Sequence, residues 1–264
     1  MSTPSGPTIA LRTPTGDIDI PLLGLGTWRA DGERGYRAVR HALDVGYRHI
    51  DTATAYQNED QVGRGIADSD VDRDEVFVTT KLPPEAAGRE RETLERSLRR
   101  LGTDHLDLWL VHWPPGGTAR PDTWRALQGL RDEGLVRAIG VSNYSVGQID
   151  ELIDVTGEAP AINQIPWSPA DHDPLVIAEH ARRRVALEGY SPFKRTDTAD
   201  PVLARIAERR GVTVHQVVLM WHIRHRVVVI PKSTDPQRIE ANLAALEVTL
   251  SDEEVAEIDG LSRR

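Results

Sequence analysis

The sequence of 264 residues contains no cysteine. This absence excludes disulfide bonds, metal sites built on thiolates and a cysteine nucleophile. It also means that cysteine usage tells nothing about the redox compartment in which the protein works.

The chain also lacks any apolar run near the roughly 20 residues that a membrane-spanning helix requires. Its first residues, MSTPSGPTIALRT, do not contain the apolar segment of a signal peptide. We therefore expect a soluble, cytoplasmic protein. A net charge of −9 and a pI near 5.5 oppose broad binding to nucleic acid or anionic membranes, but they allow a local basic pocket for one phosphate.

What the chain does contain is a regular alternation of short apolar runs, each ending in polar residues, with amphipathic helix-like stretches. The strand-like runs are 22–26, 47–51, 76–81, 106–112, 136–143, 161–164, 185–190 and 227–233. The helix-like stretches are 33–45, 59–67, 89–101, 122–133, 145–155, 172–183, helices between 200 and 225, and 235–245. Eight such units favour a closed parallel (β/α)8 barrel, an α/β fold, over an open sheet. Because such barrels commonly contain about 250 residues, we predict a single domain over 1–264.

Further local patterns refine this prediction. The alternation from Thr8 to Pro21 around Thr15-Gly16 predicts a β-hairpin that plugs the bottom of the barrel, and 251–260 predicts an additional C-terminal helix. Asp122 and Ser145 are of the residue types that cap helices, so we expect each to cap the helix that follows it.

Ionisable residues close three neighbouring strand-like runs: Asp51, Lys81 and His112. Barrel enzymes carry their sites at the C-terminal ends of the strands, so these side chains should share one rim. Tyr56, five residues beyond Asp51, can fold back over that rim from the loop. A neighbouring ammonium lowers the pKa of a tyrosine and makes it a better acid, and Asp51 would keep Lys81 cationic inside the barrel. His112 can hold and polarise a carbonyl oxygen.

Blocks along nearly the whole chain resemble the aldo-keto reductase family. They are GYRHIDTATAYQNEDQVGRGI, LDLWLVHWP, GLVRAIGVSNY, NQIPWSP, GYSPF and VVVIPKSTDPQRIEAN, in the family's order, and the branch that they resemble contains the 2,5-diketo-gluconate reductases. The resemblance implies a barrel fold, NADPH/NADP+ as the cofactor and a small carbonyl compound as the substrate. It also implies that Asp51, Tyr56, Lys81 and His112 form the catalytic tetrad.

The resemblance assigns cofactor contacts as well. Ser142, Asn143 and Gln164 match side chains that bind the nicotinamide carboxamide, and Tyr190 matches the aromatic residue that stacks on its ring. The residues that match the grip on the 2′-phosphate are Lys232, Ser233 and Arg238, and Asn242 matches a contact to the adenine. A phosphate dianion suits Lys and Arg at the start of a helix, so NADP(H) is favoured over NAD(H). Ala241 stands where relatives commonly have Glu, which predicts weaker adenosine binding.

The substrate itself is not specified by these motifs. Trp28 and Trp113 match positions where relatives place apolar walls of the substrate pocket. The run LPPEAAGRE after Lys81 lacks the aromatic residue that is common in relatives, and the sequence ends at GLSRR without their longer tail. We therefore expect an open, permissive pocket, and a monomer, as is common for relatives of this shape.

Other interpretations remain open from the sequence. Lys81 could form a Schiff base with a carbonyl substrate, or the fold could serve as a cofactor-binding sensor or regulatory subunit. Ser142 and Asn143 could simply form a capping turn. Gly24-Leu25-Gly26 lacks the third glycine of a dinucleotide-binding fingerprint, so we expect a tight turn there. The His49 and Asp51 pair has no further His cluster near it in the sequence, so we predict no metal site.

Overall fold

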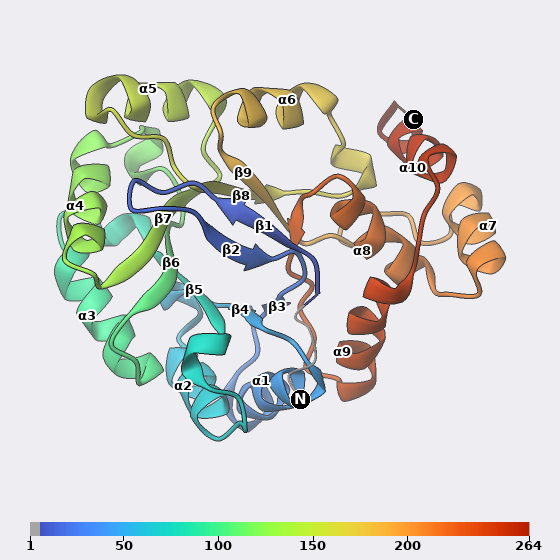
Figure 1. Ribbon diagram of the computed structural model, residues 1–264, viewed down its shortest axis with the longest axis horizontal. Coiled ribbons are helices and arrows are strands. Elements are labelled where there is room, and N and C mark those ends of the chain that lie inside the picture. The colour runs from blue at the N-terminus through green and yellow to red at the C-terminus, as the bar shows by residue number, and fades with distance from the viewer. Residues whose placement is uncertain (1–5, 264) are drawn as a thin grey trace.

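Eight parallel strands, each followed by at least one helix, form the core of the computed structural model, which describes residues 6–263 (Figure 1). In hydrogen-bonding order the strands are β10 (Val228–Val229), β9 (Ala186–Tyr190), β8 (Ile162–Pro166), β7 (Val136–Ser142), β6 (Leu106–Val111), β5 (Phe77–Leu82), β4 (His49–Asp51) and β3 (Leu25–Gly26). The predicted order of strands along the chain is confirmed. Residues 1–5 and 264 of the predicted domain lie outside the described residues, and residues 1–5 include the start of the segment MSTPSGPTIALRT.

The barrel closes where β3 meets β10. Leu23 bridges Val229 and Gly26 bridges Lys232, both in parallel register, and the Gly24 amide donates to the Val229 carbonyl at 2.9 Å. A Cβ on Gly26 would lie 2.7 Å from the Ile230 carbonyl oxygen, so glycine allows the close approach of the two strands. The tight turn expected at Gly24-Leu25-Gly26 is therefore wrong, because this segment is the strand that closes the barrel.

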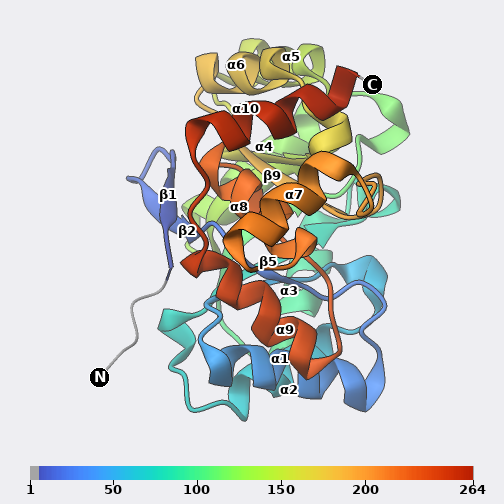
Figure 2. The ribbon, with the colours of Figure 1, turned by 90° about the vertical axis from the view of Figure 1, so that its right-hand side faces the viewer.

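Helices cover the outside of the barrel, as Figures 1 and 2 show. They are α1 (Gly32–Val45), α2 (Glu59–Ala67), α3 (Glu90–Leu101), α4 (Pro121–Asp132), α5 (Val146–Thr156), α6 (Pro174–Arg182), α7 (Pro201–Arg210), α8 (Val214–Arg224) and α9 (Pro236–Leu243). The additional C-terminal helix is confirmed as α10 (Asp252–Asp259). Each helix boundary lies within two residues of its prediction wherever one was predicted, whereas β3 begins three residues later and β10 ends four residues earlier than predicted.

The two predicted helix caps differ in outcome. Ser145 caps α5 in a capping box with Gln148, as expected. Asp122 does not cap α4. The N-cap is Arg120, Pro121 occupies the first turn, and Asp122 lies inside that turn, where its carboxylate accepts from Arg125 at 3.0 Å. Proline at the start of α4 moves the helix boundary upstream of Asp122.

The N-terminal hairpin pairs β1 (Thr8–Leu11) with β2 (Ile18–Pro21) in antiparallel register. Figure 1 looks onto this hairpin across one end of the barrel, and Figure 2 shows it from the side. Its buried residues Ile9, Leu11 and Ile20 pack with Leu108 and Ile162 of the barrel strands. The hairpin thus closes the bottom with an apolar layer, as predicted, and leaves the opposite end for polar residues.

Within residues 6–263 we find no helix whose length and apolar character would let it cross a membrane.

Candidate active site

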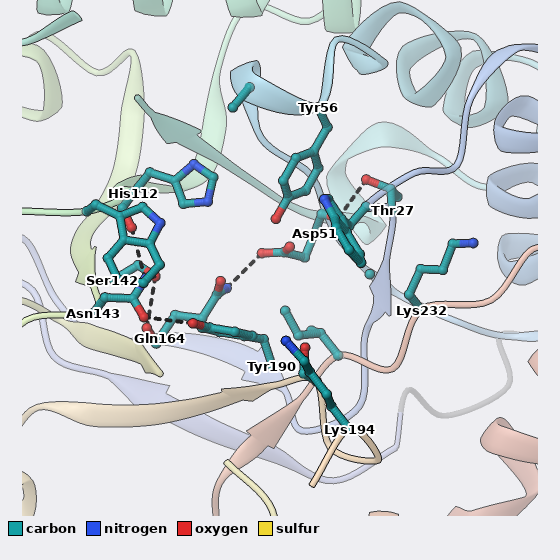
Figure 3. Close-up of a pocket in the computed structure, with 16 residues that line it drawn as sticks. Thr27, Asp51, Tyr56, His112, Ser142, Asn143, Gln164, Tyr190, Lys194 and Lys232 are labelled. Atoms are coloured by element: carbon teal, nitrogen blue, oxygen red, sulfur yellow. Dashed lines mark hydrogen bonds between the residues drawn. The ribbon is translucent and has the colours of Figure 1, made fainter. Parts of the chain in front are cut away.

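A pocket of about 480 Å³ opens at the C-terminal ends of the barrel strands (Figure 3). The predicted site residues that line it are Trp28, Asp51, Tyr56, His112, Trp113, Ser142, Asn143, Gln164, Tyr190 and Lys232. Lys81 is fully buried and lies beneath the pocket. Ser233, Arg238 and Asn242 are not among the lining residues. Asn242 is buried on α9, and Arg238 is exposed near the start of that helix.

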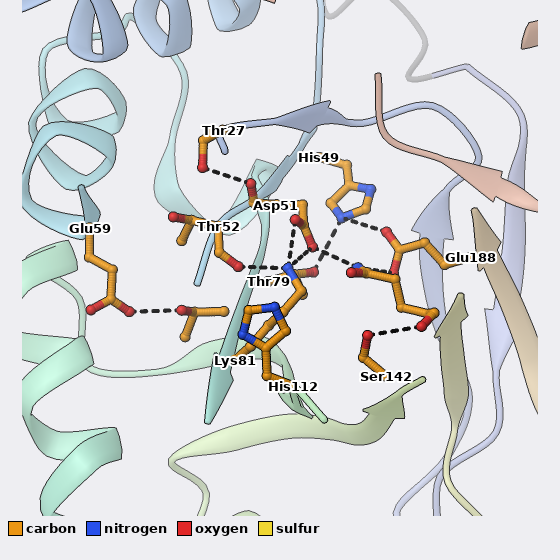
Figure 4. A network of polar contacts seen from close by, with 12 residues as sticks. Thr27, His49, Asp51, Thr52, Glu59, Thr79, Lys81, His112, Ser142 and Glu188 are labelled. Carbon is orange, nitrogen blue, oxygen red and sulfur yellow. Dashed lines mark hydrogen bonds and ion pairs between the residues drawn. The ribbon is translucent and has the colours of Figure 1, made fainter. Parts of the chain in front are cut away.

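An ion pair forms the floor of the pocket. Lys81 Nζ donates to both carboxylate oxygens of Asp51 at 2.7 Å and to the Thr52 carbonyl at 2.8 Å (Figure 4). Burial lowers the pKa of Lys81, but the charge and hydrogen bond of Asp51, together with the charges of Tyr56 and Glu188, outweigh this and hold that pKa above its usual value. Lys81 is therefore an ammonium whose three hydrogens are all used, and such a group is a poor amine nucleophile.

Tyr56 sits above this pair on η1 (Thr54–Tyr56), the short turn that follows β4. Lys81 Nζ lies 5.4 Å from the centroid of the Tyr56 ring, and the His112 ring stands edge-on to it at 5.8 Å. The buried Asn58 fixes this loop, because its Nδ2 donates to the carbonyls of Thr27 at 2.8 Å and Ala30 at 3.1 Å. The four predicted tetrad residues are thus brought together.

The protonation states of these groups follow from burial and from Lys81. Burial raises the pKa of Tyr56, and the Lys81 charge lowers it by less, so the net pKa lies above its ordinary value. Lys81 therefore lowers the pKa of Tyr56 as predicted, but the loss of water around the phenol raises it by more. Burial and then Lys81 lower the pKa of His112 to about 3. Tyr56 is accordingly a neutral phenol and His112 a neutral imidazole at ordinary pH.

A hydrogen-bonded set lines the wall opposite Tyr56. Asn143 Nδ2 donates to the His112 carbonyl at 3.1 Å and to Ser142 Oγ at 2.9 Å, and Asn143 Oδ1 accepts from the Tyr190 hydroxyl at 2.8 Å. Gln164 Nε2 donates to Asp51 Oδ2 at 2.9 Å and to Glu188 Oε2 at 3.0 Å. Both hydrogens of the Gln164 amide are used, so its Oε1 is left as an acceptor for a ligand. The capping turn considered for Ser142 and Asn143 does not describe these contacts, since Ser145 is the N-cap of α5.

The far end of the pocket is basic. Burial lowers the pKa of Lys232, and so do the nearby cations Arg34 and Arg29, while Asp31 opposes them. Cations crowded in this way repel one another, and an anion bound among them would relieve the repulsion. Ser233 Oγ accepts from the Asp235 amide at 3.1 Å, and Asp235 caps α9.

Several residues of this end of the barrel were not predicted. Thr27, Ser191 and Lys194 line the pocket, and the buried residues His49 and Glu188 lie below Asp51. Glu188 could have been found from the strand period, because it stands two residues before Tyr190 in β9 and side chains two apart face the same side. Lys194 gives no such signal, because it lies on a loop.

A separate group of possible metal ligands lies outside this pocket. His172, His225 and Asp259 offer ligand atoms within 4.8 Å of one another, so the sequence alone missed this His cluster. Asp259 Oδ1 already accepts hydrogen bonds from Trp221 Nε1 and His225 Nε2, each at 2.7 Å. These bonds hold α10 against α8, which accounts for the cluster without an ion. The prediction of no metal site stays a prediction.

Comparison with known proteins agrees with the geometry. The sequence pattern of the Aldo/keto reductase family matches residues 22–263. Methylglyoxal reductase DkgA of Salmonella typhimurium is 41% identical over 263 residues, which are 98% of this chain and 95% of that protein. Morphine 6-dehydrogenase of Pseudomonas putida is 40% identical over 261 residues, with 92% of this chain and 88% of that protein covered.

A solved structure extends the similarity to the whole fold. An aldo-keto reductase from Bombyx mori, crystallised in complex with NADP, superposes with a TM-score of 0.89 at 35% identity and covers 98% of this chain and 94% of that one. The family pattern and these identities extend over nearly the whole described chain. The chain therefore belongs to the aldo-keto reductase family of NADPH-dependent carbonyl reductases.

Proposed function

We propose that this protein reduces small aldehydes and ketones, α-dicarbonyl compounds among them, with Tyr56 as the proton donor. The observation that carries this proposal is the buried Asp51–Lys81 ion pair directly beneath Tyr56, with His112 edge-on to the same ring. A substrate oxygen held between the Tyr56 hydroxyl and the His112 imidazole would meet two neutral donors. A neutral phenol has a proton to give, and the ammonium below it stabilises the phenolate that remains.

The residues of the pocket suit an extended dinucleotide cofactor, which would supply a hydride to the carbonyl carbon when bound. Gln164 Oε1 is a free acceptor for the carboxamide N–H, and Asn143 fixes the Tyr190 hydroxyl, which orients the ring as a stacking surface. Ser142, whose Oγ accepts from Asn143 Nδ2, would be the third side chain near the carboxamide.

Phosphate binding is assigned to the basic end of the pocket. Lys232, Ser233 and Arg238 would hold the 2′-phosphate, and Arg29 and Arg34 add positive charge near Lys232. Asn242 would contact the adenine from α9, next to Ala241.

The substrate class rests on the open mouth of the pocket. The side chains of Trp28 and Trp113 line it, although the residues are 53% and 49% exposed, so they form a wide apolar entrance rather than a closed slot. Two related proteins are named for substrates of very different size, one for methylglyoxal and the other for morphine. Both facts support a permissive pocket for which a compact dicarbonyl such as methylglyoxal is the first substrate to test.

The test is NADPH oxidation by the purified protein with a panel of carbonyl compounds, compared through kcat/KM. We expect turnover of methylglyoxal and small aldehydes without any added protein, and much less with NADH. A protein that binds NADPH but turns over none of the panel would instead be a sensor or regulatory subunit. Borohydride trapping of a substrate on Lys81 would favour the Schiff-base alternative, which the fully hydrogen-bonded ammonium of Lys81 opposes.

We further propose that the chain acts as a single domain and a monomer in the cytoplasm, without nucleic acid or membrane partners. The acidic net charge of −9 supports the absence of nucleic-acid and anionic-membrane partners. Light scattering of the purified protein would test the oligomeric state.

A further inference from the structure

Below the tetrad lies a second layer of buried polar side chains that the proposed proton transfer does not use. His49 lies two residues before Asp51 on β4, Thr79 two before Lys81 on β5, and Glu188 two before Tyr190 on β9 (Figure 4). All three side chains of this layer are fully buried. His49 Nε2 lies 3.2 Å from Thr79 Oγ1 and 3.9 Å from Glu188 Oε1.

Glu188 is incompletely satisfied in this layer. Its Oε2 accepts from Gln164 Nε2 at 3.0 Å, whereas its Oε1 has no hydrogen-bond partner among the residues that the structure describes. The same Gln164 Nε2 donates to Asp51 Oδ2 at 2.9 Å. One amide group thus joins two buried carboxyl groups, which cannot both carry a negative charge without a large cost. Asp51 keeps its charge because it holds Lys81, so Glu188 is the group that retains a proton.

The titration of Glu188 is set by all the ionisable groups around it. Burial and then the charge of Asp51 raise the pKa of Glu188 to about 8, against Gln164 and Lys81, which lower it. Burial and then Lys81 lower the pKa of His49 to about 3. The pKa values of Lys81 and Tyr56 lie above their ordinary values. Burial also raises the pKa of Asp51, but the charge and hydrogen bond of Lys81 and the hydrogen bond of Gln164 oppose this, so the proton of the pair belongs to Glu188, which has no direct cation partner. Between about pH 6 and about pH 9, the charge of this group therefore changes at Glu188.

We propose that Glu188 is a positioning residue that makes the preference of the barrel for oxidised over reduced cofactor depend on pH. The inference rests on the proposed function, which puts the nicotinamide carboxamide against Gln164. The oxidised nicotinamide ring carries a positive charge and the reduced ring carries none. An ionised Glu188, one side chain below, therefore stabilises the oxidised form alone.

The sign of the effect follows from linkage. NADP+ favours the ionised carboxylate, so its binding lowers the pKa of Glu188 and releases a proton where the free protein holds one. The affinity for NADP+ consequently rises with pH until the pH passes the value at which Glu188 ionises in the free protein. At an effective dielectric constant of about 20, a unit charge about 10 Å from a charged ring changes the affinity for that ring by about tenfold.

The experiment compares the Kd values of NADP+ and NADPH, measured by quenching of tryptophan fluorescence from about pH 6 to about pH 9. Both cofactors carry the same phosphates. Titration of these phosphates therefore changes both Kd values equally and cancels in their ratio. In the wild-type protein we expect this ratio to change about tenfold toward NADP+ as the pH rises. In Glu188→Gln the ratio should stay flat, because the amide cannot ionise.

Glu59→Gln is the matched control. Glu59 is also a fully buried glutamate. Its Oε1 accepts from Thr80 Oγ1 at 2.7 Å and its Oε2 has no partner within residues 6–263, but it lies on α2 and is not among the residues that line the pocket. This variant should keep the wild-type pH dependence. A role for Glu188 in folding alone would lower the thermal stability of Glu188→Gln and leave the slope of the ratio unchanged, and that result would overturn the proposal.

Calorimetry on the wild-type protein gives a test that no variant can confound. Titration of NADP+ in two buffers of different ionisation enthalpy counts the protons released, and we expect a fraction of one proton with NADP+ and fewer with NADPH near pH 7. Equal proton release with both cofactors would refute the role of Glu188. Failure of the protein to bind either cofactor would instead refute the proposed function, so the two failures are distinguishable.

Discussion

The two ends of the pocket are built in opposite ways. At the reaction end Asp51, Lys81 and Gln164 are at most 2% exposed, and hydrogen bonds join Asp51 to both other side chains. At the end that we propose to bind the 2′-phosphate, here called the phosphate end, the side chains of Lys232 and Arg238 are exposed, and neither makes a salt bridge within residues 6–263.

This difference separates two tasks. Proton transfer benefits from donors that are fixed in a dry site before the substrate arrives, because their orientation then costs nothing during the reaction. A phosphate brings two charges of its own, so the cations that hold it can stay hydrated and mobile until it binds. Substitutions at the reaction end should therefore change kcat and stability, and those at the phosphate end should change cofactor affinity.

The largest effect is expected from Tyr56→Phe. Removal of the phenol proton should lower kcat by about 100- to 10,000-fold, the usual contribution of a general acid. The affinity for NADPH should change little, because the phenyl ring remains and the phosphate end is untouched. Steady-state kinetics with a good aldehyde, together with NADPH titration, would check both. Near-normal kcat in this variant would show that another group protonates the substrate.

The next effect concerns stability. Lys81→Met leaves Asp51 buried without its cation, and such a loss typically costs about 3–5 kcal/mol of unfolding free energy. Lys232→Met, which removes an exposed lysine at the other end, should change it by about 0.5 kcal/mol or less. Urea denaturation of the two variants would measure both. Equal losses of unfolding free energy would mean that the buried lysine of the reaction end matters no more for stability than the exposed lysine of the phosphate end.

The sequence predicts the reaction end well because a barrel converts spacing into proximity. Asp51, Lys81 and His112 close successive strands, and a parallel barrel brings such strand ends to one rim. The layer below was not predicted. His49 was considered only beside Asp51 as a metal ligand, Glu188 was not considered, and their meeting depends on the register between strands far apart in the chain. The net pKa of Tyr56 was mispredicted for a related reason, because a contact with Lys81 can be anticipated while the depth of burial cannot.

Local rules failed where the backbone of a neighbour decides the geometry. The glycines near β3 were predicted to form a turn, but Gly26 is required by the close approach of Ile230, which directly follows β10 some 200 residues away in the chain. At α4 the proline that precedes Asp122 sets the start of the helix. In both cases the residue type indicated a special backbone position. The neighbour that decided the local geometry, Ile230 for Gly26 and Pro121 for Asp122, was not taken into account.

At the phosphate end, Lys232→Ala combined with Arg238→Ala should weaken NADPH binding by about tenfold to a hundredfold, as expected for the loss of charge-assisted hydrogen bonds. NADH binding should change much less, because NADH lacks the 2′-phosphate. Titrations of both cofactors at low and high salt would also show whether the NADPH affinity of the wild-type protein falls with ionic strength. Equal losses for the two cofactors would place the 2′-phosphate elsewhere.

The smallest effect is expected at the entrance. Trp28 and Trp113 are both about half exposed, and the Arg29 guanidinium lies 4.4 Å from the centroid of the Trp28 ring. Because each ring can bury only part of its surface against a substrate, Trp28→Ala or Trp113→Ala should raise KM for bulky apolar ketones by about three- to tenfold, or about 0.7–1.4 kcal/mol. The KM for methylglyoxal should hardly change, since so small a molecule would contact Tyr56 and His112 instead. A comparable rise for methylglyoxal would mean that the tryptophans belong to the reaction end, and the boundary between the two ends of the pocket would then move outward to include them.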